Sequence, residues 1–243
     1  MKIDPVFKIF ILGLLMGCVL ISVCPVSAEA VYEPGETIRY QIKKMGIKAG
    51  DAILEYKGIV EDGGRQLVLL VFKADGFNFY DEEKIYADPE TLLPVRVERD
   101  LNIFGKKEKI IEYYEQDPAR VRIVKFKKGK DAEEQVLTKE GPIDNLYCFI
   151  YRYRSQGRFL EGETMTLELP TKRVEIKVVE KTSVKVGPGD RAAFFMESVP
   201  SEYRVWFGDD PGRTPLRIDG AVGFAKTQMI FVSSDSGEQT APK

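Results

Sequence analysis

The sequence contains no histidine, and this absence excludes several common kinds of site. Histidine-based catalytic triads, the usual zinc ligand sets and imidazole acid-base chemistry all need that residue. Cysteine is also scarce, and of the three present only Cys148 lies beyond the N-terminal apolar stretch. A single thiol cannot form an internal disulfide. Since Cys148 sits in the apolar run 146–150, we expect a small buried hydrophobic residue rather than a reactive nucleophile.

The chain also lacks an excess of charge of either sign. It carries 36 basic and 38 acidic residues, a net charge of −2, which gives no electrostatic basis for binding nucleic acid or anionic lipid in bulk. The lysines of segment 125–130 precede Asp131, Glu133 and Glu134, so we interpret them as a solvated strand end and turn. Segment 46–50 lacks the Gly-Lys-Ser/Thr ending of a phosphate loop and is interpreted as a hairpin turn that accounts for both of its glycines. No cofactor or metal site is predicted.

Residues 1–28 have the pattern of an export signal. Lys2 and Lys8 precede an uncharged, mostly apolar run, and Pro25 interrupts that run just before the small-residue sequence Val26-Ser27-Ala28. This pattern predicts cleavage near Ala28 and a periplasmic mature protein. Two other outcomes remain open: an uncleaved membrane anchor, or lipidation at Cys18, which follows Leu15-Met16-Gly17 in a loose resemblance to a lipobox.

Most of the chain after residue 36 alternates polar and apolar residues with a period of two. Ile38, Tyr40 and Ile42 predict one half-buried strand, and similar alternation occurs in segments 165–169 and 174–178. Segment 67–72 is apolar on both faces and predicts a covered central strand. Closely spaced turn signals predict about ten strands in an antiparallel meander.

One segment has helical spacing instead. Leu146, Phe149, Ile150 and Tyr153 predict a helix over 144–156 that lies across the sheet or plugs it, with Arg152 and Arg154 near its end, where cations suit the helix dipole. The predicted fold is mainly β, a curved antiparallel sheet or open β-barrel with one packed helix. We expect a signal peptide over 1–28, a single β-rich domain over 29–232 and a disordered tail over 233–243. An outer-membrane barrel is not expected, because the outward strand faces carry Glu and Lys.

Two groups of side chains are candidate sites. Adjacent carboxylates such as Asp209 and Asp210 point apart, so they suit a turn, with Arg213 holding a carboxylate, better than the facing pair a glycosidase needs. The chain has 11 Tyr and 14 Phe, several in clusters such as 77–80 and 147–151. We expect most of these aromatics to fill the core and a few to line an apolar cavity.

Several spaced motifs across the chain resemble a known family. They are Gly35-Glu36 followed by Tyr40, segment 46–52 with Gly50, Asp144 to Tyr147 with Arg152, the segment 206–217, and a glycine motif ending at Gly223. The segment 206–217 contains Trp206, Asp209, Asp210, Arg213 and Pro215. Together they resemble the exported bacterial proteins known as domain of unknown function 3108. The resemblance implies a β-rich envelope protein and brings no established catalytic residues, so we single out these positions as structural or surface motifs.

The sequence therefore predicts a non-enzymatic periplasmic protein that binds an apolar or amphipathic envelope molecule, such as a lipid. One alternative is a scaffold that contacts other envelope proteins during envelope assembly. A remote alternative is a carboxylate-dependent hydrolase that uses Asp209 or Asp210.

Overall fold

A computed structural model describes residues 31–220 and 227–236. These residues form fourteen strands and one helix, α1 (Leu146–Gln156). The strands are β1 (Glu36–Lys44), β2 (Ile47–Asp62), β3 (Arg65–Gly76), β4 (Phe79–Ala87), β5 (Pro94–Ile103), β6 (Lys106–Gln116), β7 (Ala119–Lys127), β8 (Glu133–Thr138), β9 (Thr164–Leu169), β10 (Lys172–Val186), β11 (Gly189–Val199), β12 (Arg204–Gly208), β13 (Pro215–Asp219) and β14 (Thr227–Asp235).

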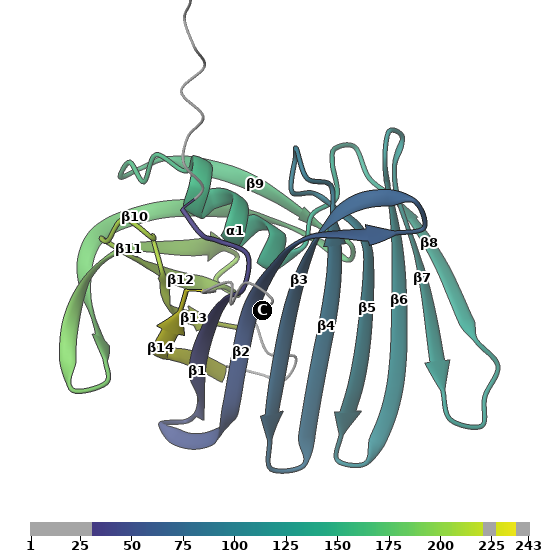
Figure 1. Ribbon diagram of the computed structural model, residues 1–243, viewed down its shortest axis with the longest axis horizontal. Helices are drawn as coiled ribbons and strands as arrows, with labels where there is room; N and C mark the ends of the chain where they lie inside the picture. Colours follow the sequence, from purple (N-terminus) through teal and green to yellow (C-terminus); the bar gives the residue numbers. More distant parts are fainter. Residues whose placement is uncertain (1–30, 221–226, 237–243) are drawn as a thin grey trace, which may run out of the picture.

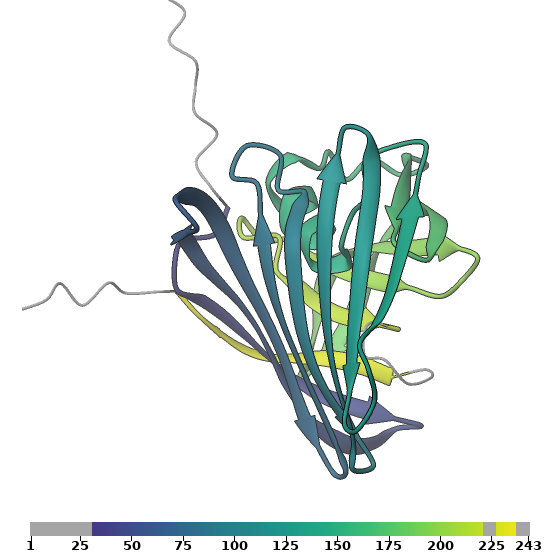
Figure 2. The same cartoon turned by 90° about the vertical axis from the view of Figure 1, so that its right-hand side faces the viewer.

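All fourteen strands belong to one antiparallel sheet that does not close. Its order is β8-β7-β6-β5-β4-β3-β2-β1-β14-β13-β12-β11-β10-β9, so β8 and β9 are its two edges. Nearly every pairing joins strands that are consecutive in the chain. The exception is β1 with β14, which join the two halves in the middle of the sheet. The sheet curves around α1 (Figures 1 and 2), which confirms the predicted open, barrel-like architecture.

The period-two pattern places alternate apolar residues of β1 and β10 in the core. Ile38, Tyr40 and Ile42 of β1 are buried, as are Val174, Ile176 and Val178 of β10. In β3, residues of both parities are buried over 67–72 except Leu69, which is partly buried, so the expectation of a covered central strand is confirmed. The meander was also predicted correctly, but about ten strands was too few. Many of the hairpins have only two residues between strands, so the turn signals in the sequence give too few strands.

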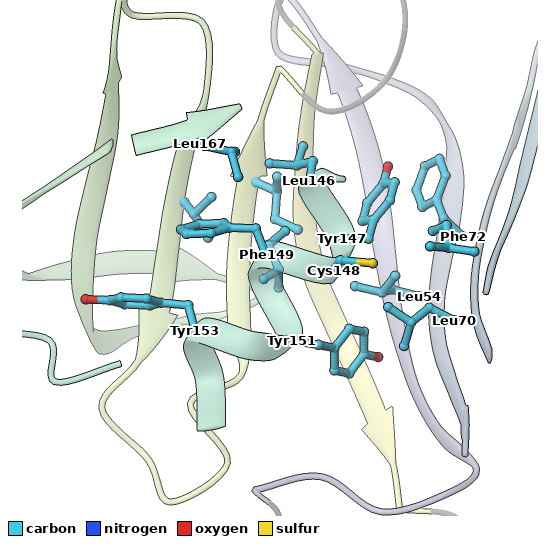
Figure 3. Close-up of a cluster of buried hydrophobic side chains, with 14 of the residues drawn as sticks. Leu54, Leu70, Phe72, Leu146, Tyr147, Cys148, Phe149, Tyr151, Tyr153 and Leu167 are labelled. Carbon is cyan, nitrogen blue, oxygen red and sulfur yellow. The ribbon is translucent and has the colours of Figure 1, made fainter. Parts of the chain in front are cut away.

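Helix α1 begins at Leu146, two residues after the predicted start at Asp144. The side chain of Asn145 accepts a hydrogen bond from the Tyr147 N–H at 2.8 Å and so caps the helix. Asp144 instead accepts from the Asn145 N–H and pairs with Arg152. The helix lies inside the curved sheet, where its aromatic residues meet the apolar residues of β2 and β3 (Figure 3).

Two further expectations need correction. The tail was predicted to start at Ser233, but Ser233 to Asp235 continue β14 because they pair with residues 37–39 of β1. Gly50 is not part of a turn. It lies in β2, where a Cβ would stand 2.2 Å from the carbonyl oxygen of Asp75, so close strand approach explains this glycine.

The predicted leader over 1–28, including Cys18, and the final residues 237–243 lie outside the described residues. Among the residues that the structure describes, no helix is long and apolar enough to cross a bilayer.

Candidate functional site

The main candidate site is a cleft of about 290 Å³ on the concave side of the sheet, which we call the interior cleft. Its floor consists of two rows of directly paired residues on β4 to β7. The first row runs Glu83, Arg99, Ile110 and Lys125, and the second includes Val97, Glu112 and Ile123. Its walls are the start of α1 (residues 145–147), the β9–β10 turn (residues 169–172) and Tyr203. The interior cleft therefore lies between strands β4 to β7 on one side and α1 with the β9–β10 turn on the other.

The floor of the interior cleft is charged, which is unusual for a concave sheet face. The Arg99 Nε lies 3.2 Å from a Glu83 carboxylate oxygen, and Arg99 also donates to the buried Asp81 at 2.8 Å. Burial raises the pKa of Glu83 to about 7, although the Arg99 guanidinium opposes the shift. Burial also raises the pKa of Glu112, while its hydrogen bond from the Tyr114 hydroxyl lowers it. Burial thus raises the pKa of two carboxyl groups in the floor of the cleft, although Arg99 lies close to both.

The same cleft has an apolar wall and one unsatisfied hydroxyl. Val97, Ile110, Ile123, Leu146 and Leu169 supply the apolar surface. Tyr147 stacks on Phe72 with ring centroids 4.5 Å apart, and its buried hydroxyl has no hydrogen-bond partner among the described residues. A buried polar atom without a partner is costly, so this hydroxyl lowers the stability of the fold.

Elsewhere the aromatic residues fill the space around α1. Tyr32, Tyr56 and Tyr151 contact one another with ring centroids 4.7 to 5.7 Å apart. A second group, Tyr153, Phe159 and Phe207, packs on the other side of the helix. Cys148 is fully buried and its sulfur faces β2 and β3 (Figure 3), as expected for a small hydrophobic residue. Burial raises the pKa of its thiol well above the usual value.

A buried ion pair joins the helix to β1. The Arg154 side chain is 0% exposed, and its guanidinium donates two hydrogen bonds to Glu36, each 2.7 Å long. It also donates to the carbonyl oxygen of Gly212 and lies 5.1 Å from the ring centres of Tyr32 and Tyr151. The sequence-based interpretation of Arg154 as a cation suited to the helix dipole missed this role, because nothing in the local pattern indicates a partner 118 residues away.

A second cleft of about 500 Å³ borders the other predicted helix motif. Asp144 and Arg152 pair with each other and line this cleft, together with Thr91, Glu140, Thr166, Glu168 and Arg173. Because Asp144 and Arg152 satisfy each other's charge, their pairing accounts for both residues without a ligand.

The Asp209–Asp210 segment forms the turn that the sequence predicted. Asp209 pairs with Lys181 at 2.6 Å and Arg213 at 2.9 Å, while Asp210 accepts a hydrogen bond from the Thr214 N–H at 3.3 Å. Hydrogen bonds from Lys181 and then Arg213 lower the pKa of Asp209, so its carboxylate stays ionised near neutral pH. A charged, fully paired carboxylate is poorly suited to donate a proton.

The remaining motif residues have structural contacts. Gly35 has a φ of 91° and donates its N–H to Tyr56, and the Tyr40 hydroxyl donates to the carbonyl oxygen of Pro215 at 2.9 Å. Trp206 stacks on Phe195, and the guanidinium of Arg217 lies 4.5 Å from the ring centre of Trp206. Gly223 lies outside the described residues. Residues 145–147 of the motif segment Asp144 to Tyr147 line the interior cleft, whereas the other described motif residues lie elsewhere.

The charged floor of the interior cleft was missed at the sequence level, although a signal was present. Asp81 and Glu83 share the parity of Phe79 and Ile85, which the alternation assigns to the buried face. Charged residues at the alternate strand positions that are otherwise apolar therefore indicate a charged interior. No cluster of three or more His, Cys, Asp or Glu side chains suited to a metal ion occurs within residues 31–220 and 227–236.

This architecture defines an open, β-barrel-like protein. A solved structure with the same overall fold is a β-barrel-like protein of domain of unknown function DUF1849 from Brucella abortus. The two chains are 10% identical with a TM-score of 0.50, and the similarity covers 86% of this chain and 100% of the other. No curated protein matches this chain in sequence.

The model of one sequence family, "Protein of unknown function (DUF3108)", matches residues 37–230. The chain belongs to this family, as its motifs predicted.

Proposed function

We propose that this protein is a non-enzymatic periplasmic binding protein for an amphipathic molecule, which it holds in the interior cleft. The observation that carries the proposal is the combined lining: apolar side chains, the charged Glu83–Arg99 pair and Tyr147 line one space. Pockets that bind small molecules are mostly apolar with a few polar groups that fix orientation. The volume of about 290 Å³ is at the lower limit of such sites, so the bound part is small or projects through the open end.

The charged floor of the interior cleft favours an amphipathic ligand over a purely apolar one. A purely apolar ligand would cover Glu83, Arg99 and Glu112 without replacing their contacts with water, which is unfavourable. A ligand with an apolar part and a hydrogen-bonding head satisfies both surfaces. The filled aromatic core around α1 also argues against a large, wholly apolar cavity there.

The test is direct recovery of the ligand from protein isolated from its native cell envelope. Organic extraction and mass spectrometry should yield one amphipathic species in a near-stoichiometric amount. Ile110→Trp fills the interior cleft, whereas Ile111→Trp places the same ring on the opposite face of β6. We expect Ile110→Trp to lose the bound species and Ile111→Trp to retain it. The absence of a stoichiometric species from the unmodified protein would contradict the proposal.

The periplasmic location rests on the leader pattern over 1–28. Mass spectrometry of the protein recovered from the periplasmic fraction should give an N-terminus at Glu29. A chain that keeps residues 1–28, or one that carries lipid on Cys18, would contradict release after Ala28.

A scaffold role in envelope assembly is the second candidate, because the edge strand β8 is paired on one side only and exposes Val136. Edge strands can take up a strand from a partner. A photo-crosslinker placed at Val136 should then capture an envelope protein that the same crosslinker at the exposed Lys177 does not.

A further inference from the structure

Four hairpin turns gather at one end of the sheet. They join β1 to β2, β3 to β4, β5 to β6 and β7 to β8, and antiparallel succession places all four at the same end, the lower edge in Figure 1. Two neighbouring turns are hydrogen-bonded to each other, because the Phe104 N–H donates to the carbonyl oxygen of Asn78 at 2.8 Å. We call residues 45–47, 77–78, 104–107 and 127–130 the hairpin rim.

Large apolar side chains stand at the tips of the hairpin rim. Met45 is 91% exposed, Phe77 is 87% exposed and Phe104 is 72% exposed, and Ile47 beside them is also exposed. These side chains contribute nothing to the core. The prediction that the cluster 77–80 fills the core or lines a cavity is therefore wrong for Phe77, because it stands at a turn beyond the end of β3.

At two of these tips the backbone has a conformation that disfavours bulky apolar residues. Met45 and Phe104 each have a φ of 51° and are followed by Gly46 and Gly105 with φ of 81° and 79°. Two successive positive φ values are typical of the type I′ hairpin turn, whose first position favours Asn, Asp or Gly. A bulky apolar residue is unfavourable there and gains no packing in return. The stability of the fold does not explain these residues, which points to a contact outside the chain.

Lysines flank the apolar tips on one side of the rim. A cleft of about 430 Å³ lies between the β5–β6 and β7–β8 turns, and its lining contains four lysines and one carboxylate, namely Lys106, Lys107, Lys127, Lys128 and Glu108, together with Gly105. Lys127 pairs with Glu133 at 2.9 Å, as expected for a neutralised strand end. Within the described part of the chain, Lys106, Lys107 and Lys128 form no ion pair with a carboxylate. This local excess of positive charge is hidden in the net charge of −2.

We propose that the hairpin rim docks onto the surface of an anionic phospholipid bilayer. Met45, Phe77 and Phe104 enter the interfacial layer, and the lysines of the rim contact lipid phosphates. Exposed apolar side chains next to lysines are the combination that binds proteins to membrane surfaces. The tips are separated by the width of intervening strands and do not form the continuous patch of a stable protein interface. This proposal does not depend on the interior cleft.

The experiment measures flotation of the chain from Glu29 onward, which contains every described strand and the helix, with lipid vesicles. One set of vesicles contains phosphatidylethanolamine with roughly a third phosphatidylglycerol, and the other contains phosphatidylcholine alone. We expect binding to the anionic vesicles only, with a fall of about tenfold or more when salt is raised several-fold. If the chain does not float with the anionic vesicles, the proposal is wrong.

Matched variants locate the contact. The double variant Phe77→Ser with Phe104→Ser should reduce vesicle binding about tenfold or more, because it removes the inserted side chains. The control is Leu160→Ser with Val232→Ser, which removes two exposed apolar residues elsewhere. Since all four side chains are exposed, each variant is expected to fold, and near-ultraviolet circular dichroism verifies it. Equal losses in both variants would overturn the proposal.

A second pair of variants tests the charge. Lys106→Glu with Lys128→Glu should abolish binding to the anionic vesicles, whereas Lys177→Glu with Lys185→Glu makes the same change in net charge away from the rim and should retain it. Size-exclusion chromatography tests whether the rim instead binds a second copy of this chain. If the unmodified chain is a dimer and Phe77→Ser with Phe104→Ser makes it monomeric, the rim is an interface between two copies and the membrane proposal is wrong.

Discussion

The Glu36–Arg154 pair is the contact whose loss should be most informative, because it is buried and joins β1 to α1. Replacing Glu36 with Gln keeps the size of the side chain but removes its charge. The Arg154 guanidinium, 0% exposed, would then lack a counterion. Removing one partner of a buried ion pair costs about 3 to 5 kcal/mol. The carbonyl oxygen of Gly212 and the new amide oxygen still accept hydrogen bonds from Arg154. We therefore expect the free energy of unfolding to fall by about 3 kcal/mol.

Urea unfolding followed by circular dichroism measures this cost. For an m value of about 3 kcal/mol per M, the midpoint of Glu36→Gln should fall by about 1 M. The matched control is Arg39→Gln on the same strand, which breaks the exposed Arg39–Asp235 pair and should change stability by less than about 0.5 kcal/mol.

A double-mutant cycle separates the ion pair from packing. Arg154→Met removes the charge that Glu36→Gln leaves unpaired, so the combined variant should be destabilised by at least about 1 kcal/mol less than the sum of the single variants. If Glu36→Gln unfolds within about 0.5 kcal/mol of the unmodified protein, or if the two effects simply add, the reasoning about the buried guanidinium is refuted.

Three other outcomes follow from the described contacts. The folded-state pKa of Glu83 of about 7 lies above the usual 4.5, so its stabilising effect is present at low pH and is lost as pH rises from about 4.5 to 7; unfolding curves of Glu83→Gln should lack this fall, and parallel pH profiles would contradict it. The Cys148 thiol should react with a disulfide reagent only in denaturant, and labelling of the native protein at the same rate would disprove its burial. Gly50→Ala should lower the free energy of unfolding by at least about 1 kcal/mol, since the new Cβ would meet the Asp75 carbonyl oxygen, whereas Gly141→Ala, with open space around it, should not.

The sequence predicts this fold well wherever the environment of a residue depends on residues close to it in the chain. Alternation placed Ile38, Tyr40 and Ile42 inside, and the Asp209–Asp210 turn followed from local turn chemistry. Contacts across the chain could not be read in this way. The partner of Arg154 is 118 residues distant, and the strand pairing that brings Glu83 against Arg99 depends on register, which the sequence specifies only through the face that is buried.

Exposure at the turns was equally hard to predict. An aromatic residue raises the expectation of burial wherever it occurs, but Phe77 lies one residue beyond the last paired position of β3. At that point the chain has left the covered part of the sheet. The hydrophobicity of Phe77 does not indicate that the chain has left the covered part of the sheet. The positive φ of the neighbouring Asn78, which the structure shows, does indicate the turn.

The pairing of β1 with β14 has a consequence for how the chain acquires its structure. As synthesis proceeds from the N-terminus, β1 to β8 can form hairpin by hairpin, and later β9 to β13 can do the same. Until β14 appears, near the C-terminal end, β1 presents an open edge, the kind of surface that takes up strands from other chains. Joining the two halves also requires closure of a loop that contains almost the entire domain, which is slow. Truncation before residue 227 should therefore do more than shorten the protein: it would leave the central seam of the sheet open and prone to aggregation.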